Sequence, residues 1–142
     1  VAMDYTIQEH CENIDWALVR DSLNNAGMAS CESEIHKKAF QNSFSVVFVF
    51  HEETMIGFGR AISDGAYQAA IYDIVVIPEY QKNGIGRMIM ETILRKVSHC
   101  NVILYANPGK EGFYAKLGFR LMKTGCAIFL NQARMEERGF IA

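Results

Sequence analysis

The chain has 142 residues, half of them hydrophobic and 21% charged, which predicts a folded domain rather than a disordered segment. The formal net charge of -2 gives no electrostatic reason to expect a nucleic-acid partner. No apolar run approaches the ~20 residues that span a bilayer, and residues 1–9 lack the pattern of a signal peptide. We therefore expect a cytoplasmic protein that binds neither nucleic acid nor membrane.

The first half of the chain is predicted to hold two helices and an antiparallel sheet. Apolar residues recur at helical spacing over residues 14–23 and 33–42. A short strand is expected at residues 5–8. Runs of β-branched and aromatic residues separated by polar turns predict three further strands, paired in sequence, over residues 44–50, 55–62 and 68–77.

The second half predicts a change of topology. An apolar stripe from Gly84 to Val97 indicates a helix, and residues 101–106 form another strand-like run. A strand, a helix and a second strand favour a right-handed crossover and therefore a parallel pair. A short helix over residues 110–117 and a final hairpin of residues 119–122 and 126–130 complete an α+β fold: a mixed, mostly antiparallel sheet with helices on both faces.

The four cysteines indicate neither a redox pair nor a metal site. They show no Cys-x-x-Cys pair and no spacing of metal ligands, so we expect reduced thiols and no metal. The residues concerned are Cys11, Cys31, Cys100 and Cys126.

The segment Gln81-Lys82-Asn83-Gly84-Ile85-Gly86-Arg87 predicts an anion site. It joins a strand to a helix, and free amides at a helix start attract a phosphate. Gly84 and Gly86 lack Cβ atoms, so a phosphate can approach the backbone, and the side chains of Arg87 and Lys82 can add positive charge. Met90 stands where a dinucleotide motif would have its third glycine, and no P-loop motif occurs. The pattern therefore favours a diphosphate other than that of a dinucleotide or a nucleoside triphosphate.

Two segments in the expected order resemble the GNAT superfamily of acyl-CoA-dependent N-acetyltransferases. Residues 71–87, I-Y-D-I-V-V-I-P-E-Y-Q-K-N-G-I-G-R, are similar to its V-x-P-x-Y and Q-x-x-G-x-G signature. Residues 107–119, N-P-G-K-E-G-F-Y-A-K-L-G-F, are similar to its N-x-x-x-x-x-F-Y-x-K-x-G-F segment. The resemblance covers nearly the whole chain and implies a single domain of this type over residues 1–142.

The resemblance implies acetyl-CoA as co-substrate and assigns residues to it. The pyrophosphate would be held by the loop that contains Gln81, Lys82, Asn83, Gly84, Ile85, Gly86 and Arg87. The pantetheine would lie along the main chain of Ile74, Val75, Val76 and Ile77, where the amide of Val75 or Val76 would bind the thioester oxygen; we assign this role to Val76. Tyr114 would protonate the departing thiolate, and Asn107 would help to place the pantetheine.

The group that accepts the proton of the attacking amine is left open. Asp73 lies in mid-strand among apolar neighbours, so it is a base, an anchor for the substrate ammonium, or a structural hydrogen-bond acceptor. Strand alternation puts Tyr72 on the opposite face from Asp73, and either face could meet the substrate if the strand bulges. Glu79 follows in a loop, and Ala70 stands near the position where some family members carry a glutamate. A route through water is the remaining alternative.

The resemblance places acceptor selectivity in residues 16–44. Acidic residues there, and two residues beside a hairpin turn, are candidates for attracting an amine: Asp21, Glu32, Glu34, Asp64 and Tyr67. We expect direct attack by a primary amine, preferably of a small molecule, in a ternary complex. The alternative is a non-catalytic acyl-CoA-binding or regulatory module on the same fold. Family habit adds the expectation of a homodimer.

Overall fold

The computed structural model describes residues 4–28 and 31–142, and the chain divides into two compact units, Val1–Leu104 and Tyr105–Ala142. Residues 1–3 and 29–30, which belong to the predicted start of the chain and to the expected acceptor region, lie outside the described residues. The first unit contains β1 (Tyr5–Gln8), α1 (Trp16–Asn25), α2 (Ser33–Gln41), β2 (Ser45–His51), β3 (Thr54–Ser63), β4 (Gln68–Val76), the 3-10 turn η1 (Pro78–Tyr80), α3 (Ile85–Lys96) and β5 (Asn101–Ile103). The second unit contains α4 (Glu111–Ala115) and α5 (Gln132–Glu137).

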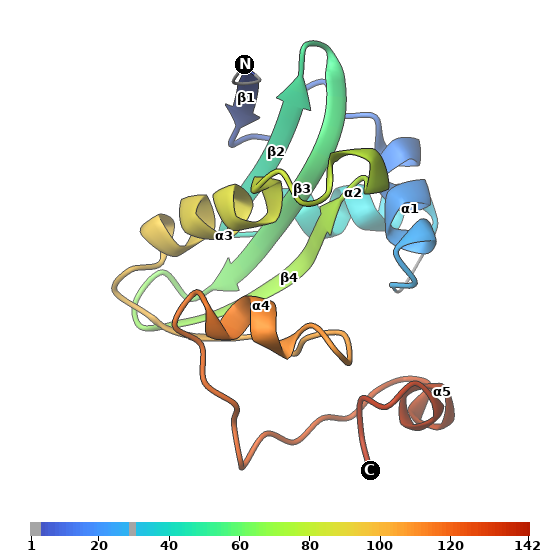
Figure 1. Cartoon of the computed structure of the whole chain (residues 1–142), viewed down its shortest axis with the longest axis vertical. Helices are drawn as coiled ribbons and strands as arrows, with labels where there is room; N and C mark the ends of the chain where they lie inside the picture. Colours follow the sequence, from blue (N-terminus) through green and yellow to red (C-terminus); the bar gives the residue numbers. More distant parts are fainter. Residues whose placement is uncertain (1–3, 29–30) are drawn as a thin grey trace. The chain divides into compact units, whose positions relative to one another are not determined.

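The first unit is built on a five-stranded sheet in the order β1-β2-β3-β4-β5 (Figure 1). The pairs β1–β2, β2–β3 and β3–β4 are antiparallel, whereas β4 and β5 are parallel. This confirms the predicted meander and the parallel pair that the intervening helix α3 implies. It also confirms the predicted α+β class with a mostly antiparallel sheet.

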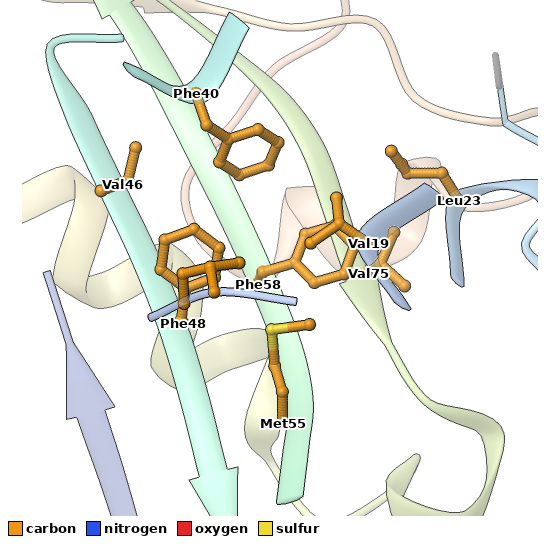
Figure 2. Close-up of a cluster of buried hydrophobic side chains, with 9 residues drawn as sticks. Val19, Leu23, Phe40, Val46, Phe48, Met55, Phe58 and Val75 are labelled. Atoms are coloured by element: carbon orange, nitrogen blue, oxygen red, sulfur yellow. The ribbon is translucent and has the colours of Figure 1, made fainter. Parts of the chain in front are cut away.

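One face of the sheet is covered by α1 and α2 (Figure 1). The rings of Phe40, Phe48 and Phe58 pack together there, with centroids 5.5 Å apart for the first two and 5.8 Å apart for Phe40 and Phe58. Figure 2 shows these rings gathered with aliphatic side chains of α1 and β4. The buried cluster consists of Ile14, Val19, Leu23, Phe40, Val46, Phe48, Met55, Phe58 and Val75.

The opposite face is covered by α3. Gly59 of β3 lies beside Ile89 and Ile93 of α3, while its neighbour Phe58 points into the cluster under α1 and α2. Because successive side chains of a strand point to opposite faces, α3 must lie across the sheet from α1 and α2. The prediction of helices on both faces is thus confirmed.

The predicted final hairpin is wrong: neither residues 119–122 nor residues 126–130 form a strand. A strand needs a ladder partner for its amides, and two of these amides bond elsewhere. The N–H of Phe119 donates to the carbonyl of Tyr114 at the end of α4, and that of Phe129 donates to Oε1 of Gln132. Beyond these residues the chain forms the short helix α5.

None of the helices in the described part of the chain combines the length and the apolar character needed to span a bilayer.

Candidate active site

The outer edge of β4 is open over most of its length. Strand β5 pairs with β4 only from Gln68 to Ala70, and no other strand among the described residues lies beside the remainder of that edge. The backbone groups of residues 73–76 that point this way therefore have no ladder partner among the described strands. An extended ligand that carries amides can add to such an edge as a further strand would.

A bulge in β4 decides which amides face the open edge. Phe58 pairs with Val75 but Arg60 pairs with Tyr72, so two residues of β4, Asp73 and Ile74, lie opposite one residue of β3. Asp73 has a φ of 59°, in the left-handed region. An extra residue in one strand shifts the alternation of its backbone groups by one position.

Two hydrogen bonds show this shift. The carbonyl of Tyr67 accepts the N–H of Asn101 at 2.8 Å, so odd-numbered residues at the start of β4 face β5. Beyond the bulge, the N–H of Ile77 donates to the carbonyl of Ile56 at 2.9 Å, so odd-numbered residues face β3 instead. Alternation then turns the backbone groups of Ile74 and Val76 toward the open edge, and those of Val75 toward β3.

The carbonyl of Val76 already has a hydrogen-bond donor. It accepts a hydrogen bond of 3.1 Å from Nε2 of Gln81, the first residue of the predicted diphosphate loop. The geometry agrees with the assignment of Val76, rather than Val75, as the residue whose amide faces a ligand. The catalytic role itself stays a prediction.

The loop before α3 has the features of an anion site. Lys82 and Gly84 both have positive φ, 67° and 78°, and the first turn of α3 has no side-chain cap among the described residues. The helical ladder starts with the N–H of Met88 and the carbonyl of Gly84, so the amides of residues 85–87 precede it. A Cβ atom on Gly84 would meet nothing within 4 Å, which leaves room above the loop. These features fit a diphosphate.

The side chains of the loop are held by local bonds. Nε of Arg87 lies 2.6 Å from Oε1 of Glu91 one turn along α3, and both side chains are exposed. Nδ2 of Asn83 donates to the carbonyl of Tyr80, whose hydroxyl lies 2.7 Å from Nδ1 of His51 at the end of β2. The seven predicted loop residues therefore form one continuous loop, and the contact between Tyr80 and His51 connects η1 to the sheet.

Asp73 does not stand alone in its strand. Its Oδ2 accepts a hydrogen bond of 2.7 Å from Nε of Arg60, and the two side chains are 19% and 14% exposed. The guanidinium of Arg60 also lies over the rings of Phe40 and Tyr72 and donates to Oγ of Ser43. Of the three roles left open for Asp73, this contact favours the structural one.

Sequence reasoning missed Arg60, and the regular alternation expected for Tyr72 and Asp73 does not hold because the strand bulges. The bulge removes the simple alternation, so Tyr72 and Asp73 both contact Arg60 rather than lying on opposite faces. The signal in the sequence was a lone cation in one apolar strand and a lone carboxylate in the next.

A small cavity of about 100 Å³ adjoins the end of β4. No described residue that lines it carries a charge, so it offers no carboxylate to a substrate ammonium. Its walls come from the end of α1 and from the segment after the bulge: Ser22, Asn25, Ala26, Val75, Val76, Ile77, Pro78 and Gln81.

The acidic candidates are engaged or exposed. Asp21 pairs with Arg20 at 2.9 Å, and Glu34 and Glu79 are exposed. Oδ1 of Asp64 accepts the amides of residues 66–68, which holds the pKa of this carboxyl below its usual value. Within the described residues no group of three His, Cys, Asp or Glu side chains could hold a metal ion.

Tyr114 and Asn107 lie in the second unit. Tyr114, in α4, is half-buried and contacts the rings of Phe113 and Phe119 with centroids 5.0 Å and 5.9 Å away. Burial raises the pKa of its phenol, so the hydroxyl stays protonated at neutral pH. The carbonyl of Asn107 accepts the N–H of Lys110 at 2.9 Å, which shapes the turn into α4.

Comparison with known proteins places this geometry in a family. Residues 12–119 match the model of the acetyltransferase (GNAT) family. The chain is 31% identical over 122 residues to an uncharacterized N-acetyltransferase ycf52 of Gracilaria tenuistipitata var. liui, covering 81% of this chain and 60% of the relative. It is 29% identical over 128 residues to the chloroplastic serotonin N-acetyltransferase 2 of Oryza sativa subsp. japonica, covering 84% and 64%.

A solved structure shows the same fold. The GNAT family acetyltransferase of Streptococcus pneumoniae TIGR4 superposes with a TM-score of 0.76 at 22% identity, over 91% of this chain and 99% of that one. The two curated relatives are longer, and the chain spans less than two thirds of their length. On the match to its family model, which covers most of its residues, the chain belongs to the GNAT family of acetyltransferases.

Proposed function

We propose that this protein transfers the acetyl group of acetyl-CoA to a primary amine of a small molecule, by direct attack in a ternary complex. The observation that carries the proposal is the open edge of β4 leading to the uncapped start of α3. A ligand with an amide-bearing arm and a diphosphate matches both features. Acetyl-CoA, the co-substrate of the family, has both.

In the proposed reaction the main chain of β4 binds and polarises the thioester. The amides of residues 85–87 and the N-terminal charge of α3 hold the pyrophosphate. The amide of Val76 donates to the thioester oxygen; loss of one such donor typically costs about 10²–10³-fold in turnover. This use of the backbone leaves the side chain of Val75 free for the core, where it is 5% exposed.

Tyr114 is the proposed acid. A thiolate that leaves needs a proton, and a phenol with a raised pKa still carries one at neutral pH. Asn107, at the entrance to α4, is the proposed second contact for the pantetheine. Tyr114→Phe is expected to lower the turnover number by roughly 10²-fold without weakening acetyl-CoA binding. An unchanged turnover number at saturating acetyl-CoA across the pH range would exclude the acid role.

The acceptor amine is proposed to lose its proton to water. Asp73 is engaged by Arg60, and no described residue lining the cavity is charged. An alkylamine has a pKa of about 10, so the rate should rise with pH as the neutral amine becomes more abundant. The name of the rice relative refers to serotonin, a small amine, which supports a small acceptor here.

Thermal unfolding with acetyl-CoA tests the binding site first. Acetyl-CoA at 100 times its dissociation constant should add about 2.7 kcal/mol of stability, while NAD and ATP serve as controls. CoA release with a panel of amines then tests transfer. A selective shift with no turnover for any amine would favour the alternative, a non-catalytic acyl-CoA-binding module. No shift in folded protein would refute the pyrophosphate site.

The cytoplasmic location and the homodimer stay predictions. Cell fractionation and the mass of the protein in solution test them directly.

A further inference from the structure

We propose that Asp73 is a positioning residue: held by Arg60, it fixes the bulge of β4 and thereby turns the amide of Val76 toward the open edge. The effect on catalysis rests on the proposed function. The effect on the backbone does not, and can be measured separately.

The first step of the argument is the alternation of β4. Without the bulge, the odd-numbered residues that face β5 at the start of the strand would face the same way at its end. Val75 would then point its amide outward and Val76 would point its amide toward β3. The bonds of Tyr67 and Ile77 on opposite edges show that the bulge reverses this order.

The second step is the conformation that the bulge requires. Asp73 has a φ of 59°, a region that costs most L-residues roughly 1–2 kcal/mol. Asn and Asp enter it more readily than other residues with side chains, Gly enters it freely, and β-branched residues avoid it. An aspartate therefore suits this position for its backbone as well as for its charge.

The third step is the anchor. The side chain of Asp73 accepts from Arg60 at 2.7 Å, and Arg60 is itself confined by two aromatic rings and by Ser43. The guanidinium carbon lies 5.6 Å from the ring centroid of Phe40 and 5.4 Å from that of Tyr72. An unusual backbone conformation persists where its surroundings fix it from several sides, as they do here.

The fourth step separates this role from that of a general base. Oδ2 of Asp73 already accepts the N–H of Arg60, which directs this oxygen toward the guanidinium. A base would act through its charge, so every neutral substitution would abolish it. A positioning residue acts through its backbone, so substitutions should rank by their tolerance of positive φ.

The test is the series Asp73→Asn, Asp73→Gly, Asp73→Ala and Asp73→Val. Hydrogen exchange of the Val76 and Val75 amides, followed by NMR without any ligand, reports the direction of the backbone. In the wild type and in the Asn and Gly variants, the Val76 amide should exchange faster than that of Val75. In the Val variant the order should reverse, because the alternation returns to that of a regular strand. An unchanged order in folded Asp73→Val would overturn the proposal.

Kinetics add the catalytic consequence. The Asn and Gly variants should lose less than about tenfold in kcat, whereas the Val variant should lose about 10²–10³-fold, as on removal of an oxyanion donor. KM for acetyl-CoA and the thermal shift that acetyl-CoA gives should change little in the Asn and Gly variants, because the direction of the amides is kept. In the Val variant both should weaken as well, because the pantetheine is proposed to bind the main chain of residues 74–77, which the reversal turns away. A general loss of structure would instead remove amide protection throughout the sheet. If Asp73→Val does not fold, a kcat of the Ala variant below those of the Asn and Gly variants would support the same conclusion.

The outcomes distinguish the two proposals. If all four variants lost kcat equally, and the fall in rate at low pH disappeared, Asp73 would be the base and the positioning role would be overturned. A wild type that binds acetyl-CoA but transfers nothing would refute the proposed function. The exchange order of the two amides would still decide the positioning role.

Discussion

The contact between α3 and the sheet depends on Gly59, and Gly59→Ala tests it. An added Cβ would meet Cδ1 of Ile74, and it would lie 2.9 Å from Cγ2 of Ile89 and 3.3 Å from Cδ1 of Ile93. Ile74 can rotate the end of its side chain away. Cγ2 of Ile89 is fixed closer to the helix, so α3 must move outward. Overpacking of this kind costs about 1–3 kcal/mol, or roughly 2–12 °C in melting temperature for a chain of this size.

Thermal unfolding and acetyl-CoA binding should both respond to Gly59→Ala. Because α3 carries the proposed diphosphate site at its start, displacement of the helix should weaken the thermal shift given by acetyl-CoA. Gly112→Ala is the matched control: its Cβ would meet nothing within 4 Å in α4, and Ala is favoured over Gly in a helix by about 0.5–1 kcal/mol. A Gly59→Ala protein that melts with the wild type would refute the tight packing of α3.

Three further predictions concern polar groups around the site. Burial lowers the pKa of His36 below its usual value, so the neutral side chain stabilises the fold. This stabilisation is complete above pH ~6.5 and is lost as the pH falls toward the lowered pKa. The variant His36→Gln should therefore show a smaller change of melting temperature with pH in this range. Tyr80→Phe removes the hydrogen bond to His51 and should cost about 0.5–1.5 kcal/mol in urea unfolding while weakening acetyl-CoA binding. Arg60→Met should destabilise the protein more than the double variant with Asp73→Asn, with a coupling free energy of about 0.5–3 kcal/mol.

Each of these predictions has an outcome that contradicts it. If His36→Gln keeps the wild-type dependence of the melting temperature on pH, His36 does not titrate as described. Equal acetyl-CoA affinity in Tyr80→Phe would show that η1 is placed without the bond to His51. Additive losses at Arg60 and Asp73 would mean that the pair contributes no coupling.

The sequence predicted the sheet because its strands carry strong local signals. Runs such as residues 45–50 are apolar and β-branched, and the polar turns between them fix sequential pairing. Boundaries moved where a cap was overlooked: α1 starts at Trp16 rather than at residue 14 because Oδ1 of Asp15 accepts the amides of Ala17 and Leu18. An aspartate just before an apolar helical pattern is a usual start signal, so this error could have been avoided.

The final hairpin could not be excluded from the sequence. Residues 119–122 and 126–130 are apolar enough for strands, but a strand also needs a partner that accepts its amides. In the structure Leu121 is 81% exposed and Ile128 is 93% exposed, and the local amides bond to α4 and to Gln132. Pairing is a property of the surroundings, and local composition does not contain it.

The candidate site was likewise predictable only in part. The loop before α3 could be predicted, because glycines at a strand–helix junction are a local signal. The bulge was only an alternative, because no residue of β4 marks its position in the sequence, and a single residue with positive φ is enough to reverse the alternation. Arg60 was missed for the same reason, since its partner depends on that reversal.

The proposed chemistry places its main demands on the backbone. The amide of Val76, the start of α3 and the open edge of β4 are main-chain features, so the side chains there are constrained by conformation rather than by reactivity. A fold shared with the Streptococcus pneumoniae protein at 22% identity fits this view, because many sequences can satisfy the same φ values. Substitutions in this site should therefore be judged first by the backbone they permit. Asp73 illustrates this best. Its charge suggests a base, whereas its φ of 59° points to the proposed role of setting the direction of the amides that follow it.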